Sequence, residues 1–173
     1  MCYFDKVFTH KKATVDVLSH QLKNPVFGRV DTIVGMGMSG VTPLMAVSLA
    51  SGVPFAIVRK SWDAGRHYSE EGSHSDKEIE NGFSGFHIGR YVIIDDFVDS
   101  GKTIVEIIEA LSSACEKNIC VGVLLYQSNG FCANLNDDYP ELPFVGCGHE
   151  ISDVQRLESN ERTTAKNQKR ITC

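Results

Sequence analysis

Two adjacent acids and a hydroxyl-rich turn follow an apolar run in the middle of the chain. Residues 91–104 read YVIIDDFVDSGKTI, which places Asp95 and Asp96 directly behind a predicted strand. Carboxylates in that position can accept hydrogen bonds from neighbouring hydroxyl groups of a sugar. The turn behind them opens a predicted helix, whose free N–H groups and dipole favour a phosphate. The order of acids and amides therefore predicts a site for a sugar that carries a phosphate group.

The turn itself supplies further donors. Ser100 and Thr103 carry hydroxyl groups, and Gly101 lets the backbone come close to a ligand. A structural explanation exists as well, because Asp-Asp and Asp-Ser-Gly are common turn formers after a core strand. The sequence Gly101-Lys102-Thr103 also looks like the end of a P-loop, but the first glycine of that motif would fall at position 96, which is an aspartate. A P-loop nucleotidase is therefore not the expected class.

A second glycine-rich segment, GMGMSG at 35–40, follows a predicted strand and opens a predicted helix. It matches the G-x-G-x-x-G pattern of dinucleotide-binding folds, which also place an acidic residue about 20 positions further on for the ribose. The end of the next predicted strand carries Arg59 and Lys60 instead. A binding site for the 2′-phosphate of NADP would explain these cations, so an NADP-binding Rossmann domain is an open alternative. That alternative leaves Asp95 and Asp96 unexplained.

Predicted strands and helices alternate along the chain and specify how these segments are positioned. Apolar runs predict strands at 31–36, 53–60, 91–95, 119–127 and 143–148, the last one less clearly. Helices are predicted at 6–22, 41–50 and 103–114, with Pro43 in the first turn of the second, where its missing N–H costs little. This alternation predicts an α/β fold, a Rossmann-like parallel sheet with helices on both faces. Ligands of such sheets bind outside the carboxyl ends of the strands, and all three polar segments follow a strand directly.

Size and charge limit the possible classes of protein. A chain of 173 residues with 42% hydrophobic content is expected to form one compact domain over residues 1–173. The net charge of −5 and the pI near 5.6 argue against a nucleic-acid partner. No segment approaches the roughly 18 consecutive apolar residues that span a bilayer. The charged N-terminus is unlike a signal peptide, so we expect a cytoplasmic protein without a membrane partner.

The stretch VIIDDFVDSGKT at 92–103 closely resembles the phosphoribosyl-pyrophosphate-binding motif of type I phosphoribosyltransferases. VPFAIVRK at 53–60 is similar to the strand of adenine phosphoribosyltransferases that ends in an Arg-Lys pair, and GMSG at 37–40 falls where the family places its pyrophosphate loop. The order and spacing agree from about residue 31 to residue 127. The resemblance implies the type I phosphoribosyltransferase fold, with a core at about 28–130, a flexible loop at 61–86, a small hood at 131–157 and a polar tail at 158–173.

The resemblance also implies roles for individual residues. Asp95 and Asp96 would bind the ribose hydroxyls and reach Mg²⁺, directly or through water. The residues implied at the 5′-phosphate are Asp99, Ser100, Gly101, Lys102 and Thr103. The residues implied at the pyrophosphate are Met38, Ser39, Gly40, Arg59 and Lys60. The residues implied at the base are Phe144, which would stack on it, and Val145, which would offer its backbone.

Two of these positions bear on the acceptor. Asp99 stands where hypoxanthine-guanine enzymes carry an aspartate that handles the proton on the purine N7, and this implies a catalytic role for it. Phe144 would be equally well explained as an ordinary core residue.

The implied activity is Mg²⁺-dependent transfer of the 5-phosphoribosyl group from phosphoribosyl pyrophosphate to a nucleobase nitrogen, with release of pyrophosphate. Asp99 favours a 6-oxopurine slightly over adenine as the acceptor. Relatives commonly form homodimers, so a homodimer is expected. The alternative within the same family is a regulator that binds phosphoribosyl pyrophosphate without catalysis.

Overall fold

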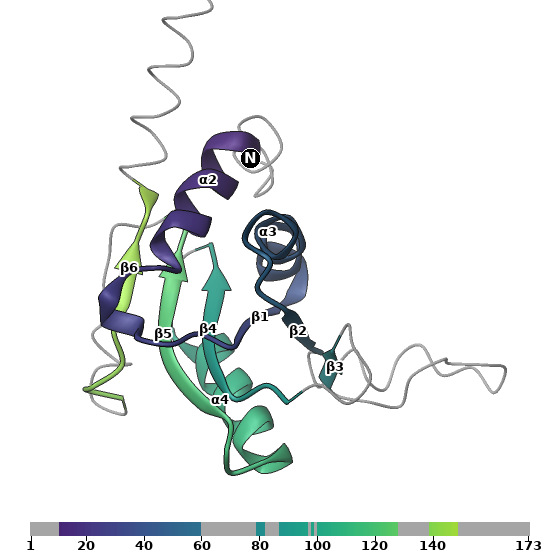
Figure 1. Ribbon diagram of the computed structural model, residues 1–173. Helices are drawn as coiled ribbons and strands as arrows, with labels where there is room; N and C mark the ends of the chain where they lie inside the picture. The colour runs from purple at the N-terminus through teal and green to yellow at the C-terminus, as the bar shows by residue number, and fades with distance from the viewer. Residues whose placement is uncertain are drawn as a thin grey trace, which may run out of the picture.

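The computed structural model describes residues 11–59, 79–81, 87–96, 98, 100–127 and 139–148. Their strands form one six-stranded sheet in the order β3-β2-β1-β4-β5-β6 (Figure 1). The strands are β1 Thr32–Met36, β2 Phe55–Val58, β3 Ile79–Asn81, β4 Arg90–Asp95, β5 Ile119–Leu125 and β6 Phe144–Gly146. The helices are α2 Lys11–Gln21, the 3-10 helix η1 Pro25–Phe27, α3 Gly37–Ser51 and α4 Lys102–Ala114. All strand pairs are parallel except β2 with β3, which confirms the predicted α/β sheet.

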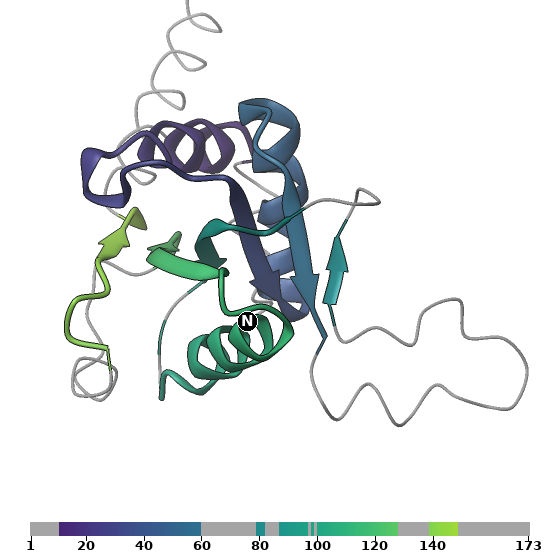
Figure 2. The same ribbon diagram turned by 60° about the horizontal axis from the view of Figure 1, so that its bottom comes forward.

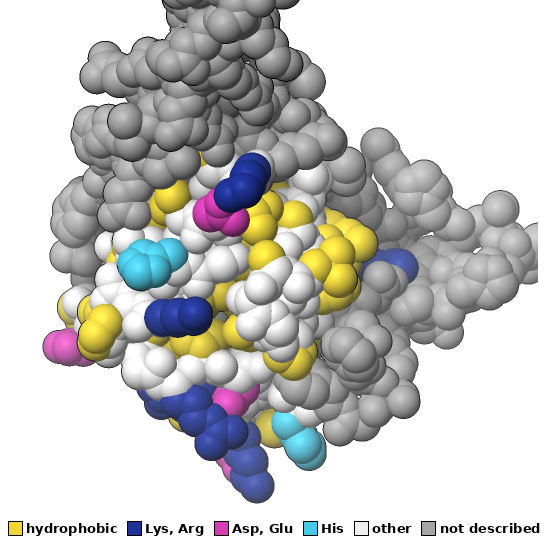
Figure 3. Space-filling view, turned by 45° about the horizontal axis from the view of Figure 1, so that its top comes forward, with side chains coloured by type: hydrophobic (Ala, Val, Ile, Leu, Met, Phe, Trp, Pro, Cys, Tyr) yellow, Lys and Arg dark blue, Asp and Glu magenta, His cyan; other side chains and the backbone are white. Residues whose placement is uncertain are grey.

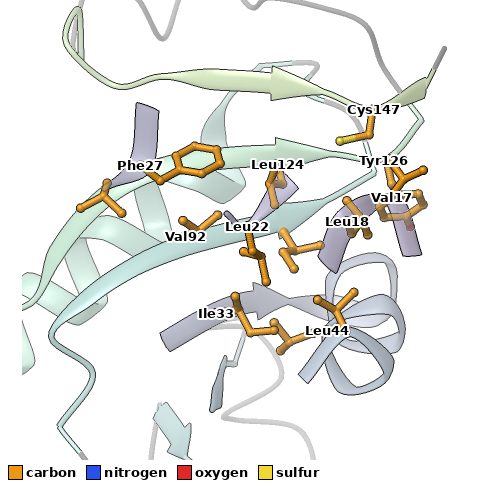
Figure 4. Packing of buried hydrophobic residues seen from close by; sticks show 13 residues of the cluster. Val17, Leu18, Leu22, Phe27, Ile33, Leu44, Val92, Leu124, Tyr126 and Cys147 are labelled. Atoms are coloured by element: carbon orange, nitrogen blue, oxygen red, sulfur yellow. The ribbon is translucent and has the colours of Figure 1, made fainter. Parts of the chain in front are cut away.

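Helices cover both faces of this sheet (Figure 2). Leu18 of α2 and Leu44 of α3 pack in one core cluster, on the side that Figure 4 shows from close by. Ile107 of α4 packs in a second cluster on the opposite face. Strand β4 contributes alternate residues to the two clusters, Val92 to the first and Ile93 to the second. Because β4 is buried on both faces, its sequence is the continuous apolar run that is typical of a central parallel strand.

Helix α3 begins earlier than the sequence predicted. It starts at Gly37, immediately after β1, whereas the apolar pattern placed its start at residue 41. Gly37 adopts a φ of 64°, a left-handed conformation that lets the chain turn sharply from strand to helix. The prediction that Pro43 lies in the first turn was therefore wrong, because the earlier start puts this proline inside the helix.

The polar segment at 61–86 contains a strand that its sequence did not predict. Ile79–Asn81 forms β3, which pairs antiparallel with β2 at the edge of the sheet. An edge strand needs only one paired neighbour, so three residues without a strong apolar pattern suffice. The rest of the predicted flexible loop, most of the hood at 131–157 and the tail at 158–173 lie outside the described residues. None of the helices in the described part of the chain has the length and apolar character needed to span a bilayer.

Candidate functional site

The two aspartates lie where β4 ends, at the carboxyl edge of the sheet. Asp95 is the last residue of β4 and Asp96 follows it, and both side chains are buried, with exposed fractions of 6% and 7%. The Ser39 hydroxyl donates a hydrogen bond of 3.1 Å to Oδ1 of Asp95, which also accepts the backbone N–H of Asp96 at 3.0 Å. The structure thus brings the first turn of α3 and the end of β4 together, as the sequence predicted.

The end of β5 fixes the backbone of the same two acids. The N–H of Tyr126 donates to the carbonyl of Asp95 at 3.1 Å, and the N–H of Gln127 donates to that of Asp96 at 2.8 Å. The Tyr126 hydroxyl donates to the carbonyl of Ser39 at 2.9 Å. Burial and the charges of Asp96 and Asp95 raise the pKa of Tyr126, so its hydroxyl keeps the proton that it donates. Tyr126 was not among the predicted site residues, and its only sequence signal is its place at a strand end.

Glycines allow this close approach of α3 to the sheet. A Cβ on Gly40 would lie 3.0 Å from the carbonyl oxygen of Ile94 and 3.2 Å from the Cα of Gly35. A Cβ on Gly35 would lie 3.0 Å from the carbonyl carbon of Gly40. Because these neighbours are backbone atoms, a side chain at either position would push the helix away from the acids. Gly35 and Gly40 of the GMGMSG segment are thus both required by packing, whatever ligand the site takes.

The turn behind the acids does open a helix. Gly101 is the N-cap of α4 with a φ of 78°, and its carbonyl accepts the N–H groups of Ile104 and Val105. Lys102 is the first residue of α4, and its ammonium lies 3.6 Å from Glu106 on the next turn. Its N–H approaches the Ser100 hydroxyl at 3.4 Å. The N–H groups of Lys102 and Thr103, the first two residues of α4, have no partner inside the helix, which suits an anion.

Thr103 lies in the same first turn of α4, half-buried, whereas Asp99 falls outside the described residues. Arg59 follows β2, and Val58 pairs with Met36, so Arg59 lies at the same edge of the sheet as the start of α3. Lys60 is outside the described residues, as is the Met38 side chain, although the Met38 backbone belongs to the first turn of α3.

The predicted base-binding residues lie further from the acids. Phe144 and Val145 belong to β6, two strands away from β4, and each packs against one of the core clusters. Phe144 pairs with Val123, two positions before the residue level with Asp95. Standard strand spacings put the Cα atoms of Phe144 and Asp95 about 12 Å apart. The structure places Phe144 as a half-buried core residue and does not bring it beside the aspartates.

The two carboxylates share a poorly solvated site. Burial, opposed by the hydrogen bond from the Asp96 N–H and assisted by the Asp96 charge, raises the pKa of Asp95 to about 7. Ionisation of Asp95 beside the Asp96 side chain is therefore costly until a cation or hydroxyl donors approach it. Mg²⁺ is usually held by one or two carboxylates together with substrate oxygens, so this pair fits it. Within the described ranges, no group of three or more His, Cys, Asp or Glu side chains is placed to hold a metal ion. Mg²⁺ at this pair would therefore need further ligands such as substrate oxygens.

The raised pKa of Asp95 predicts how the stability of the ligand-free protein depends on pH. The folded state binds a proton that the unfolded state releases near pH 4, so the free energy of unfolding should fall as the pH rises from about 4 to about 7. Asp95→Asn removes this ionisation and should stabilise the ligand-free protein at pH 8 by at least about 1 kcal/mol. Thermal melts between pH 5 and pH 8 measure this difference. Asp16→Asn, at an exposed carboxylate, is the control, and a wild-type profile parallel to that of Asp95→Asn would contradict the prediction.

Comparison with known sequences assigns the chain to a protein family. The phosphoribosyl transferase domain family matches residues 9–139. The transcriptional regulator GfcR of Methanocaldococcus jannaschii is 38% identical over 120 residues, which are 68% of this chain and 52% of the relative. A hypoxanthine/guanine phosphoribosyltransferase of Methanobacterium paludis is 30% identical over 112 residues, 60% of this chain and 55% of the relative. The chain thus spans about half the length of the curated relatives it matches.

Solved structures show the same fold. An orotate phosphoribosyltransferase from Aeropyrum pernix superposes with a TM-score of 0.57 at 17% identity, over 84% of this chain and 76% of that chain. An adenine phosphoribosyl transferase from Trypanosoma brucei, solved with AMP, pyrophosphate and ribose-5-phosphate, gives a TM-score of 0.56 at 20% identity, over 78% and 62% of the two chains. The fold and the family match agree, and the chain belongs to the phosphoribosyl transferase domain family, with the fold of the type I phosphoribosyltransferases.

Proposed function

We propose that this chain binds phosphoribosyl pyrophosphate at the carboxyl edge of its sheet and transfers the 5-phosphoribosyl group to a nitrogen of a purine, in the cytoplasm. The observation that carries the proposal is the buried Asp95–Asp96 pair, held between the first turn of α3 and the start of α4. A 6-oxopurine is the favoured acceptor, because several relatives of this chain are hypoxanthine/guanine phosphoribosyltransferases. Family membership gives the acid pair a role that a dinucleotide-binding domain leaves unexplained, so NADP binding is not proposed.

Each group of residues at the carboxyl edge of the sheet has a proposed role in this reaction. Asp95 and Asp96 would accept hydrogen bonds from the ribose hydroxyls and hold Mg²⁺, directly or through water. The N–H groups at the start of α4 would bind the 5′-phosphate, and those of the first turn of α3 would bind the pyrophosphate with help from Arg59. A bound Mg²⁺ would supply positive charge against the departing pyrophosphate. The bond from C1 to the pyrophosphate oxygen breaks as the bond to the base nitrogen forms, and Asp99 is the proposed acceptor of the base proton.

The proposed active unit is a homodimer. Apolar side chains are exposed on the face that carries α2 and α3 (Figure 3). Helix α3 carries the exposed apolar side chains of Met45 and Leu49, with exposed fractions of 48% and 88%. Residues of this kind are common where a surface is covered by a second chain.

A second function is a sensor that binds phosphoribosyl pyrophosphate without turning it over. It is favoured by the 38% identity to a transcriptional regulator. The acidic balance of this chain argues that any nucleic-acid contact of such a regulator would come from another protein or domain.

One assay distinguishes the two functions. Purified protein is incubated with phosphoribosyl pyrophosphate, Mg²⁺ and one base from a panel of hypoxanthine, guanine, xanthine, adenine, orotate and uracil, and pyrophosphate release is measured. The transferase predicts release with a 6-oxopurine and little with the others. Tight binding of phosphoribosyl pyrophosphate with no release for any base would identify the sensor. Absence of binding would show that neither function is right.

A further inference from the structure

The carbonyl of Ser39 lacks its usual donor because of a proline four residues later. In an α-helix, the carbonyl of each residue accepts the N–H of the residue four positions further on. For Ser39 in α3 that residue is Pro43, which has no N–H. A polar backbone group near the sheet is costly to leave without a partner, so another donor is needed.

Tyr126 supplies that donor from a different strand. Its side chain is 3% exposed, and its hydroxyl donates to the carbonyl of Ser39 at 2.9 Å. The hydroxyl of Ser39 in turn donates to Asp95 at 3.1 Å. The backbone N–H of Tyr126 holds the carbonyl of Asp95 at 3.1 Å. Tyr126, Ser39 and Asp95 therefore form a closed set of contacts that joins the ends of β5 and β4 to the first turn of α3.

We infer that Tyr126 is a positioning residue, which holds the first turn of α3 in place beside Asp95 so that its free N–H groups can receive the pyrophosphate of the ligand. The inference rests on the proposed function, since that function supplies the pyrophosphate. Tyr126 acts through Ser39 and does not itself touch the ligand. Pro43 is the second half of the arrangement, because it releases the Ser39 carbonyl from its own helix and leaves it to Tyr126.

Tyr126→Phe tests the inference by removing the hydroxyl alone. We expect the Kd for phosphoribosyl pyrophosphate and for pyrophosphate, measured by calorimetry with Mg²⁺ well below the melting temperature, to rise about tenfold, the size of effect that one lost hydrogen bond can have. A purely structural role would lower the melting temperature without changing either Kd. An unchanged Kd for both ligands would overturn the inference.

Tyr91→Phe is the matched control. Tyr91 is completely buried, and among the described residues its hydroxyl has no hydrogen-bond partner within normal distance. The Cys120 thiol, which is a weak partner, and the Tyr139 side chain lie near it. Removing this hydroxyl should leave both Kd values unchanged and should not lower the melting temperature.

Pro43→Ala provides the rescue, because it restores an N–H that can bond to the Ser39 carbonyl within the helix. In that background, Tyr126→Phe should raise the Kd for phosphoribosyl pyrophosphate less than threefold, about a third of its effect in the wild type. An equal effect in both backgrounds would show that the Ser39 carbonyl is not the link. Failure of the wild type to bind phosphoribosyl pyrophosphate or pyrophosphate would instead overturn the proposed function and the positioning role with it. The melting temperatures of the wild type, Tyr126→Phe, Pro43→Ala and the double variant then report separately on the contribution of this hydrogen bond to stability.

Discussion

Replacing both acids, Asp95→Asn with Asp96→Asn, should abolish pyrophosphate release while leaving the protein folded. Hydrogen bonds to charged groups contribute roughly 1.5–3 kcal/mol each, so loss of both carboxylates should weaken phosphoribosyl pyrophosphate binding by about 10²–10⁴-fold. The fold should survive because amide side chains keep the size of the acids and the hydrogen bonds that Asp95 accepts from Ser39 and Asp96. Turnover and calorimetric titration measure the loss, and circular dichroism checks the fold.

The control for this variant is an exposed carboxylate elsewhere on the chain. Asp16 pairs with Lys12 on the surface of α2, so Asp16→Asn should leave turnover and affinity unchanged. Wild-type activity in the Asp95→Asn, Asp96→Asn protein would show that the two carboxylates have no role in binding or turnover and that the acids serve only to form the turn after β4.

Gly40→Ala should weaken ligand binding by displacing the start of α3, which lies beside the acids. The new Cβ would meet the carbonyl oxygen of Ile94 at 3.0 Å and the Cα of Gly35 at 3.2 Å, and neither backbone atom can rotate away. The start of α3 must therefore shift, which should cost about 1–3 kcal/mol of stability. The same shift would move the N–H donors and the Ser39 hydroxyl, so we expect the affinity for phosphoribosyl pyrophosphate to fall more than tenfold. Thermal melts and calorimetric titration measure the two effects.

Gly52→Ala separates these effects at the opposite end of α3. Gly52 has open space around its Cα but a φ of 74°, so an added methyl group should cost about 1 kcal/mol through backbone strain. Because Gly52 is remote from the acids, its substitution should leave affinity unchanged. Equal losses of affinity in the two variants would indicate that general destabilisation, and not displacement of the α3 start, is responsible.

Much of the sheet could be predicted from local patterns. The run Tyr91–Ile94 is apolar at every position because β4 is covered on both faces, and the spacing of Ile104, Ile107 and Leu111 matches the buried side of α4. Such signals depend on residues close together in sequence. The place of Asp95 at the strand end follows from the same pattern, since the apolar run stops there.

Other features depend on contacts that no local pattern contains. The start of α3 at Gly37 is set by close packing of Gly40 on Ile94, more than 50 residues away in the chain. The partner of Tyr126 lies 87 residues earlier, so its aromatic ring reads in the sequence as another core residue at a strand end. β3 is likewise defined by its pairing with β2, in which Ile79 lies opposite Val58, 21 residues earlier in the chain.

The pairing of Val58 with Ile79 has an evolutionary consequence. It places the two ends of the connecting segment at neighbouring points of the sheet. The entropy cost of closing such a connection rises by only about 0.6 kcal/mol for each doubling of its length. Insertions and deletions between β2 and β3 can therefore accumulate among relatives while the sheet, and the acids at its edge, keep their geometry. A lineage could in this way change what surrounds an inherited sugar-phosphate site without having to fold a new one.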